Sequence, residues 1–221
     1  MVQNTAQTGP APKAPAASRR GFFLSLAAVA VVVAGIALDT RVVPVGSEAD
    51  LRQQAFSPDS YGEKEFPRIA EAVTAKAGDA AELAAAVAAD KDAAIAKYGT
   101  PSTTGAIMAV RVTGTAGEAK AGIYPLTVAG LPDGVAVRVQ TGPAINGTDL
   151  RDAPGDIAFG GFKNQIEYQN AGAGINRAMK AAVLDKIDAA NLTGKTVEVV
   201  GAFRMINPKN WLITPVAVVV K

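Results

Sequence analysis

A run of seventeen uncharged residues, Phe22–Leu38, most constrains what this chain can fold into. It is too long for an ordinary core strand and close to the length of helix that crosses ~30 Å of hydrocarbon. The residues before it are rich in Pro, Ala, Thr and Gln, a composition typical of disordered segments. The pattern therefore predicts a disordered cytoplasmic tail over 1–20, a transmembrane anchor or signal over 21–38, and a folded part beyond them.

The placement of charges predicts the orientation of this anchor. Lys13, Arg19 and Arg20 are the only charged residues before the run, and all 20 acidic residues lie at or after Asp39. Because basic residues are retained on the cytoplasmic side, we expect a single-pass inner-membrane protein with its C-terminal part in the periplasm. Two points stay open, namely cleavage of a signal after Ala37 and export by the twin-arginine rather than the Sec route.

Two residue types that the sequence lacks exclude several classes of function. The chain has no cysteine and no histidine. The absence of cysteine excludes disulfides, thiolate metal sites and a lipid-acylated cysteine, and without cysteine and histidine the chain has no Ser-His or Cys-His nucleophile. We therefore expect no metal site, no cofactor and no enzyme that uses these residues. The part beyond the run is near neutral and has no basic block, which argues against nucleic acid as a partner. A hydrolase using carboxylates such as Asp149 and Asp152 is the remaining enzymatic alternative, although no catalytic constellation is recognisable.

A juxtamembrane segment over 39–60 precedes a helical pair predicted over 61–99. Apolar residues from Phe66 to Val73 share one face of the first helix, and we expect Pro67 in its first turn. Asp79 has the chemistry of an N-cap for the second helix, with Glu82 three residues later.

From residue 105 the apolar period changes to two, which indicates strands. Five strands are predicted, at 107–114, 123–128, 135–139, 195–205 and 211–220. A helix expected over 175–190 falls between the third and fourth of them. This order predicts an α+β fold with an OB-like five-stranded barrel over 105–221 that carries a helix-bearing insertion between strands 3 and 4. A small open α+β sheet is the alternative. We expect Trp211 to pack at the barrel end and Arg111, Arg138 and Arg204 to lie on a solvated strand face.

Several unrelated motifs occur in a fixed order: Arg41-Val42-Val43-Pro44, the polar stretch over 142–168, Gly194-Lys195-Thr196 and Leu212-Ile213-Thr214-Pro215. From about Arg41 to Lys221 the chain thereby resembles a bacterial family of unknown activity, the domain of unknown function 2291, described as predicted periplasmic lipoproteins. The resemblance implies an envelope protein. Members tend to be encoded beside sugar ABC transporters, which implies an accessory role with a permease or solute-binding protein as partner. The missing lipobox cysteine departs from the lipoprotein description, and the helix over 21–38 would replace a lipid anchor.

The polar residues after the third strand supply the candidate site residues, which are Arg151, Asp152, Asn164, Gln165, Tyr168 and Asn176. Guanidinium, carboxylate and amide groups make paired hydrogen bonds to sugar hydroxyls, and Tyr168 offers an aromatic face. The pattern predicts ligand or partner contact, and a carbohydrate or small-polyol binding module is the alternative function. The competing interpretation, in which these residues satisfy backbone groups at turns, stays open.

Overall fold

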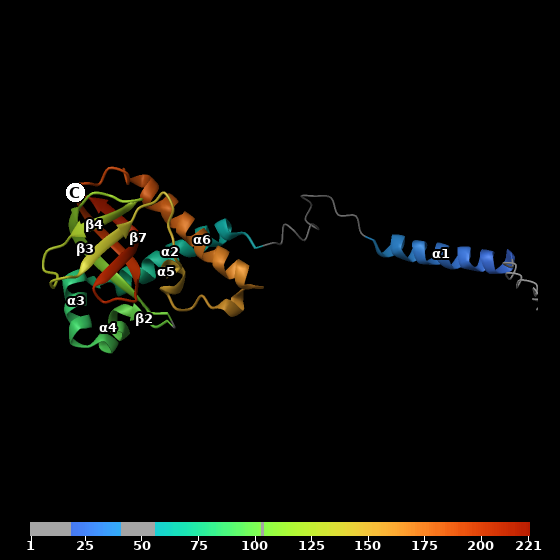
Figure 1. Ribbon diagram of the computed structural model, residues 1–221, viewed down its shortest axis with the longest axis horizontal. Helices are drawn as coiled ribbons and strands as arrows, with labels where there is room; N and C mark the ends of the chain where they lie inside the picture. The colour runs from blue at the N-terminus through green and yellow to red at the C-terminus, as the bar shows by residue number, and fades with distance from the viewer. Residues whose placement is uncertain (1–18, 41–55, 103) are drawn as a thin grey trace, which may run out of the picture. The chain divides into compact units, whose positions relative to one another are not determined.

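A computed structural model describes residues 19–40, 56–102 and 104–221 of the chain (Figure 1). The chain divides into two compact units, Met1–Ala55 and Phe56–Lys221. The tail predicted over 1–20 and the juxtamembrane segment predicted over 39–60 lie mostly outside the described residues.

In the first unit the described residues form the helix α1 (Arg19–Asp39), which includes the predicted apolar run. Its side chains are described at Phe23 and from Leu26 onward. Within the part of the chain that the structure describes, no helix is long and apolar enough to cross a membrane. The predicted single-pass anchor over 21–38, and the inner-membrane location that depends on it, are therefore not supported.

The second unit is built on a closed five-stranded barrel. Its strands are β3 (Ala106–Ala116), β4 (Ile123–Thr127), β5 (Ala136–Gln140), β6 (Thr196–Met205) and β7 (Asn210–Val220). They pair in the order β3-β4-β5-β7-β6, and β6 pairs back onto β3, so the sheet closes. All pairs are antiparallel except β5–β7, which is parallel. The predicted OB-like barrel is confirmed, and the alternative of an open sheet is wrong.

The barrel interior is filled by alternate side chains of these strands, as a strand period of two requires. Trp211 is fully buried and stacks on Phe203, with ring centroids 4.8 Å apart. Its indole Nε1 donates a hydrogen bond to the carbonyl oxygen of Pro208 at 2.7 Å, which satisfies the polar end of the ring. The prediction that Trp211 packs at the end of the barrel is confirmed.

Three helices, rather than the predicted pair, precede the barrel: α2 (Pro58–Lys76), α3 (Ala80–Ala89) and α4 (Lys91–Tyr98). The first helix begins earlier than expected because Ser57 caps it and Pro58 occupies its first turn, where a missing N–H costs nothing. Pro67 therefore lies inside α2, and its expected place in the first turn is wrong. Asp79 caps α3 as predicted and accepts from the backbone N–H of Ala81 at 2.9 Å. The two-residue strands β1 (Gly78–Asp79) and β2 (Gly99–Thr100) flank α3 and α4 and pair with β3.

The insertion between β5 and β6 contains α5 (Asp149–Asp152), α6 (Gln165–Ala182) and two 3-10 turns, η1 (Phe159–Gly161) and η2 (Leu184–Lys186). The helix predicted over 175–190 thus starts ten residues earlier. The reason is a cap: Asn164 Oδ1 accepts from the N–H of Glu167 at 2.9 Å, and the Glu167 carboxylate accepts from the N–H of Lys163 at 2.9 Å. Asn164 is one of the residues that the sequence pattern assigned to a polar site.

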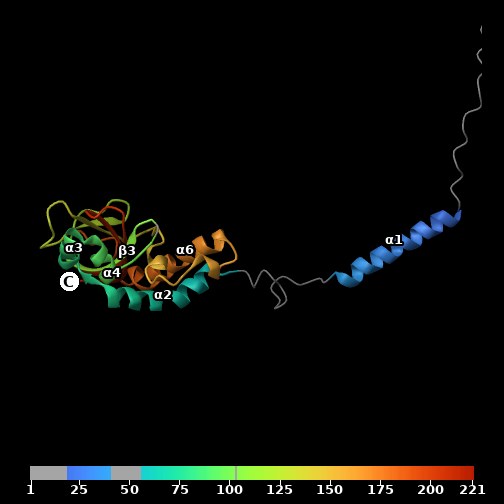
Figure 2. The same ribbon diagram turned by 90° about the horizontal axis from the view of Figure 1, so that it is seen from below.

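Helices α2 and α6 lie along each other at one side of the barrel (Figures 1 and 2). Apolar residues of these two helices pack against α5 and the outer faces of the strands and form a second core. Its members include Phe66, Ile69, Val73, Ile107, Ala109, Leu150, Ile175, Met179, Val200 and Val216. The helices approach closely at two glycines. A Cβ on Gly62 would lie 2.2 Å from the carbonyl oxygen of Gly174, and one on Gly174 would lie 1.9 Å from that of Pro58. This crossing fixes the position of α6, which carries Tyr168 and Asn176.

Candidate functional site

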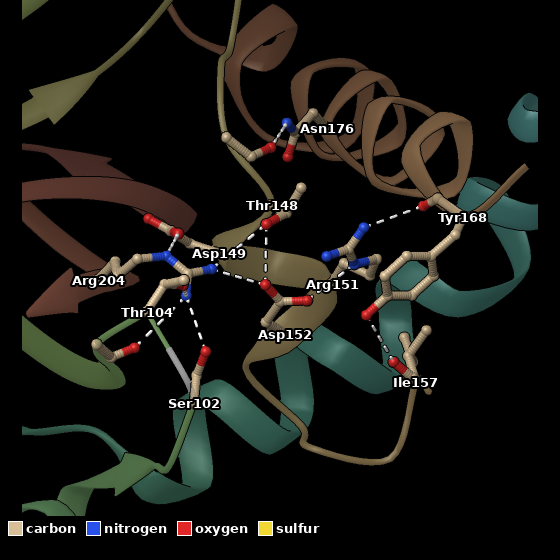
Figure 3. A network of polar contacts seen from close by, with 12 residues as sticks. Ser102, Thr104, Thr148, Asp149, Arg151, Asp152, Ile157, Tyr168, Asn176 and Arg204 are labelled. Carbon is tan, nitrogen blue, oxygen red and sulfur yellow. Dashed lines mark hydrogen bonds and ion pairs between the residues drawn. The ribbon is translucent and has the colours of Figure 1, made fainter. Parts of the chain in front are cut away.

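A network of charged and hydroxyl side chains gathers where β6 ends, and Arg204 lies at its centre (Figure 3). Arg204 Nη1 donates to Ser102 Oγ at 3.0 Å and to Thr104 Oγ1 at 2.9 Å, and Nη2 donates to Asp152 Oδ2 at 2.6 Å. Its side chain is only 16% exposed. The expectation of a solvated strand face is therefore wrong for Arg204, because the segment before β3 and helix α5 cover this end of the strand.

Helix α5 supplies two carboxylates and a second guanidinium to this network. Asp149 Oδ1 forms an ion pair with Arg204 Nε at 3.3 Å. Asp152 Oδ1 accepts from Arg151 Nε at 2.8 Å, and its Oδ2 accepts from Thr148 Oγ1 at 2.9 Å as well as from Arg204. Both oxygens of Asp152 are thus committed to partners within the protein. A carboxylate held in this way is poorly placed to act as the nucleophile of a hydrolase.

Burial and hydrogen bonding shift the pKa values of the two aspartates of α5 in opposite directions. Burial raises the pKa of Asp149 above its usual value, and the positive charge of Arg204 offsets only part of this effect. Burial also pushes the pKa of Asp152 upward, but hydrogen bonds from Arg151, Thr148 and Arg204 outweigh it and hold the pKa below its usual value. Asp152 is therefore the firmly ionised member of the pair.

Arg151 is held between α5 and α6 by Tyr168. Its guanidinium lies over the Tyr168 ring, 3.6 Å from the centroid, and its Nη1 donates to the Tyr168 carbonyl oxygen at 3.0 Å. The Tyr168 hydroxyl donates to the carbonyl oxygen of Ile157 at 3.3 Å. Gly172 lets α6 approach α5 closely, since a Cβ there would lie 3.3 Å from Thr148 Cγ2 and 3.9 Å from Arg151 Cδ. One face of the Tyr168 ring is covered by Arg151, so that face does not stack on a sugar.

The other predicted site residues lie elsewhere in the structure. Asn164 caps α6, and Gln165 is exposed at the first residue of that helix. Asn176 is buried and its Nδ2 donates to the carbonyl oxygens of Gly147 at 2.9 Å and Ile145 at 3.4 Å. It braces the loop that leads into α5. Of the six candidate residues, the structure thus brings together only Arg151, Asp152 and Tyr168. The contacts of Asn164 and Asn176 agree with the competing interpretation, in which such residues satisfy backbone groups at turns.

The network borders a cavity of about 540 Å³, within the range of small-molecule sites. Its lining is Pro101, Ser102, Thr104, Gly147, Thr148, Asp149, Arg151, Asp152, Gly155, Ile157, Tyr168 and Arg204. Two arginines face two aspartates, so the cavity is polar and close to charge-balanced. Within the described residues, no cluster of acidic side chains has the arrangement needed to hold a metal ion. Sequence reasoning missed Arg204, Ser102 and Thr104 as members of the site, because they come from segments far from the insertion.

The fold and the cavity define an OB-type barrel that carries a polar site on its helical insertion. An OB-fold protein from Thermotoga maritima, solved as a crystal structure, is similar: the two chains are 17% identical with a TM-score of 0.57. The similarity covers 76% of this chain and 99% of that one. At this identity the likeness shows the fold alone.

The chain belongs to the family of predicted periplasmic lipoproteins (DUF2291), whose model matches residues 26–219. The resemblance in its motifs is thereby confirmed, and membership indicates an envelope-associated periplasmic protein. No curated protein matches the chain. The sequence contains no cysteine, so it departs from the family description in offering no thiol for a lipid.

Proposed function

We propose that this protein is a periplasmic accessory of solute uptake that binds a small polyhydroxylated solute in the cavity beside Arg204. The observation that carries the proposal is the convergence of ionic and hydroxyl groups from four separate segments on one cavity of about 540 Å³. Sugars and polyols are recognised by such groups, because each hydroxyl both donates and accepts hydrogen bonds.

The second part of the proposal is association with a sugar ABC transporter, through its permease or its solute-binding protein. What supports this part is the gene neighbourhood that family membership implies, rather than a surface of the molecule. We propose no catalytic role, because both oxygens of Asp152 are engaged by neighbouring side chains.

Thermal unfolding of the full-length protein in detergent tests the binding function. A panel of pentoses, hexoses and their polyols would be added at increasing concentration. A ligand at one hundred times its Kd stabilises by about 2.7 kcal/mol, which corresponds to a rise in Tm of roughly 5–10 °C for a chain of this size. No rise with any member of a broad panel would contradict the proposed binding function.

Two variants test whether the solute that raises Tm binds in this cavity. Thr104 is exposed at the rim of the cavity, so Thr104→Trp is expected to block entry and abolish the rise in Tm. Asn164 lies outside the cavity lining, so Asn164→Ala is expected to lower the starting Tm but to leave the ligand-induced rise unchanged. An equal rise in wild-type protein and in Thr104→Trp would place binding elsewhere.

Crosslinking in cells followed by mass spectrometry tests the association with a transporter. We expect permease or solute-binding subunits among the captured proteins. Their absence, in cells that express the transporter, would remove the accessory role and leave a free binding module.

A further inference from the structure

Arg151 has an uncommitted nitrogen inside the cavity. Its side chain is only 8% exposed. Nε donates to Asp152 and Nη1 to the Tyr168 carbonyl oxygen, whereas no group in the described parts of the chain accepts from Nη2 (Figure 3). A buried donor of a charged group that lacks an acceptor is costly, and buried donors are paired in the great majority of cases. The open Nη2 therefore indicates an acceptor that the protein itself does not supply.

Arg204, in the same cavity, has its nitrogens fully engaged. Every nitrogen of Arg204 contacts an acceptor: Nε pairs with Asp149, Nη1 reaches two hydroxyls, and Nη2 reaches Asp152. Arg204 thus holds the network together, whereas both hydrogens on Nη2 of Arg151 and one of the two on its Nη1 have no acceptor among the described residues. Both oxygens of Asp152 already accept hydrogen bonds, so the group that is missing on this side of the cavity is a hydrogen-bond acceptor for Arg151.

We propose that Arg151 binds the carboxylate of an acidic sugar, such as an aldonic or uronic acid. This proposal rests on the proposed function and names the class of solute for the same cavity. A planar carboxylate matches the two parallel N–H groups of a guanidinium edge. The Tyr168 ring beneath the guanidinium holds its plane in place, so little side-chain freedom is lost on binding.

The charges of the cavity favour a carboxylate over a phosphate. Asp149 and Asp152 line the same cavity as Arg151 and bring negative charge close to any anion that enters. Because Arg151 and Arg204 already balance these two aspartates, each negative charge on the ligand is repelled, and a carboxylate brings one such charge where a phosphate dianion brings two.

Isothermal titration calorimetry of the full-length protein tests this inference. The probes are gluconate and galacturonate, their neutral counterparts glucose and galactose, and inorganic phosphate. We expect at least one acid to bind ten-fold or more tightly than its neutral counterpart. Arg151→Lys keeps the charge but loses the forked edge, so it should weaken binding of the acid at least ten-fold. Arg177→Lys is the matched control, since Arg177 is an exposed arginine of α6 outside this cavity, and it should bind as the wild type does.

A second measurement keeps the inference testable if Arg151→Lys does not fold. Modification of arginines by phenylglyoxal can be followed residue by residue with mass spectrometry in the wild-type protein. Bound galacturonate or gluconate should slow modification of Arg151 at least several-fold and leave Arg177 unaffected. Equal rates at Arg151 with and without an acid that calorimetry shows to bind would overturn the inference.

The outcomes separate this inference from the function on which it rests. If neutral sugars bind as tightly as the acids, the proposed function stands, but the inference that Arg151 binds a carboxylate is wrong. Binding of phosphate alone would overturn the acidic-sugar class. No binding of any probe, together with a flat response to the wider panel of neutral solutes, would overturn both.

Discussion

Asp152 is expected to stabilise the fold far more than an ion pair of similar length on the surface. Its carboxylate accepts from Arg151, Thr148 and Arg204 at 2.6–2.9 Å, and its side chain is 17% exposed. Asp152→Ala would leave two largely buried guanidinium groups without their shared acceptor. Breaking a buried ion pair by removing one partner costs about 3–5 kcal/mol, and the remaining exposure places this change near the low end, at about 3 kcal/mol.

The matched control is Arg177→Ala, which breaks the pair between Arg177 and Asp59. That pair is 2.6 Å long, but its two side chains are 55% and 66% exposed. Exposed pairs contribute under about 1 kcal/mol, because water and salt screen them. Urea unfolding of each full-length variant, followed by circular dichroism and extrapolated to zero denaturant, gives both losses. Similar losses for the two variants, or a loss below about 1 kcal/mol for Asp152→Ala, would show that burial does not decide how much these contacts stabilise the fold.

Three further changes test other parts of the structure. The depressed pKa of Asp152 contributes stability above its unfolded pKa of about 3.9 that is lost as pH falls through the folded value. The raised pKa of Asp149 contributes stability at low pH that is lost as pH rises through the folded value. Asp152→Asn should therefore cost more free energy of unfolding than Asp149→Asn at pH 7. In urea unfolding series the two losses should converge as pH is lowered through and below about 4, and a constant difference would contradict the assignment. Gly174→Ala should destabilise by about 1–3 kcal/mol, because its methyl group would overlap the Pro58 carbonyl oxygen, and an unchanged Tm would show that α2 and α6 separate freely. Asn164→Ala should cost about 1 kcal/mol in the same assay through loss of the α6 cap, and Asn164→Asp should retain most of that stability.

The barrel was predictable from the sequence because strand patterns are local. Alternating apolar residues from Ile107 onward and the Asp-Gly turn at 133–134 mark strands without reference to the rest of the chain. The start of α6 was missed for a related reason. Asn164 and Glu167 have the side chains of both a polar site and a capping box, and periodicity alone does not separate the two.

The site was predictable only in part because its members come together through the tertiary fold. Arg151, Asp152 and Tyr168 belong to one insertion, so a local polar stretch pointed to them. Arg204 is more than fifty residues from Asp152 in the chain, and its strand position indicated an outward-facing side chain. Ser102 and Thr104 reach Arg204 only because the chain passes from β2 to β3 beside it, which no local pattern shows.

A crystal structure of the full-length protein with the solute that gives the largest rise in Tm would show whether solute binds beside Arg151 and Arg204. We expect the solute in the cavity between α5 and the end of β6, with an oxygen atom about 2.7–3.2 Å from Arg151 Nη2. A solute bound elsewhere, for example in the cavity lined by Tyr124, Lys180 and Asp188, would contradict it.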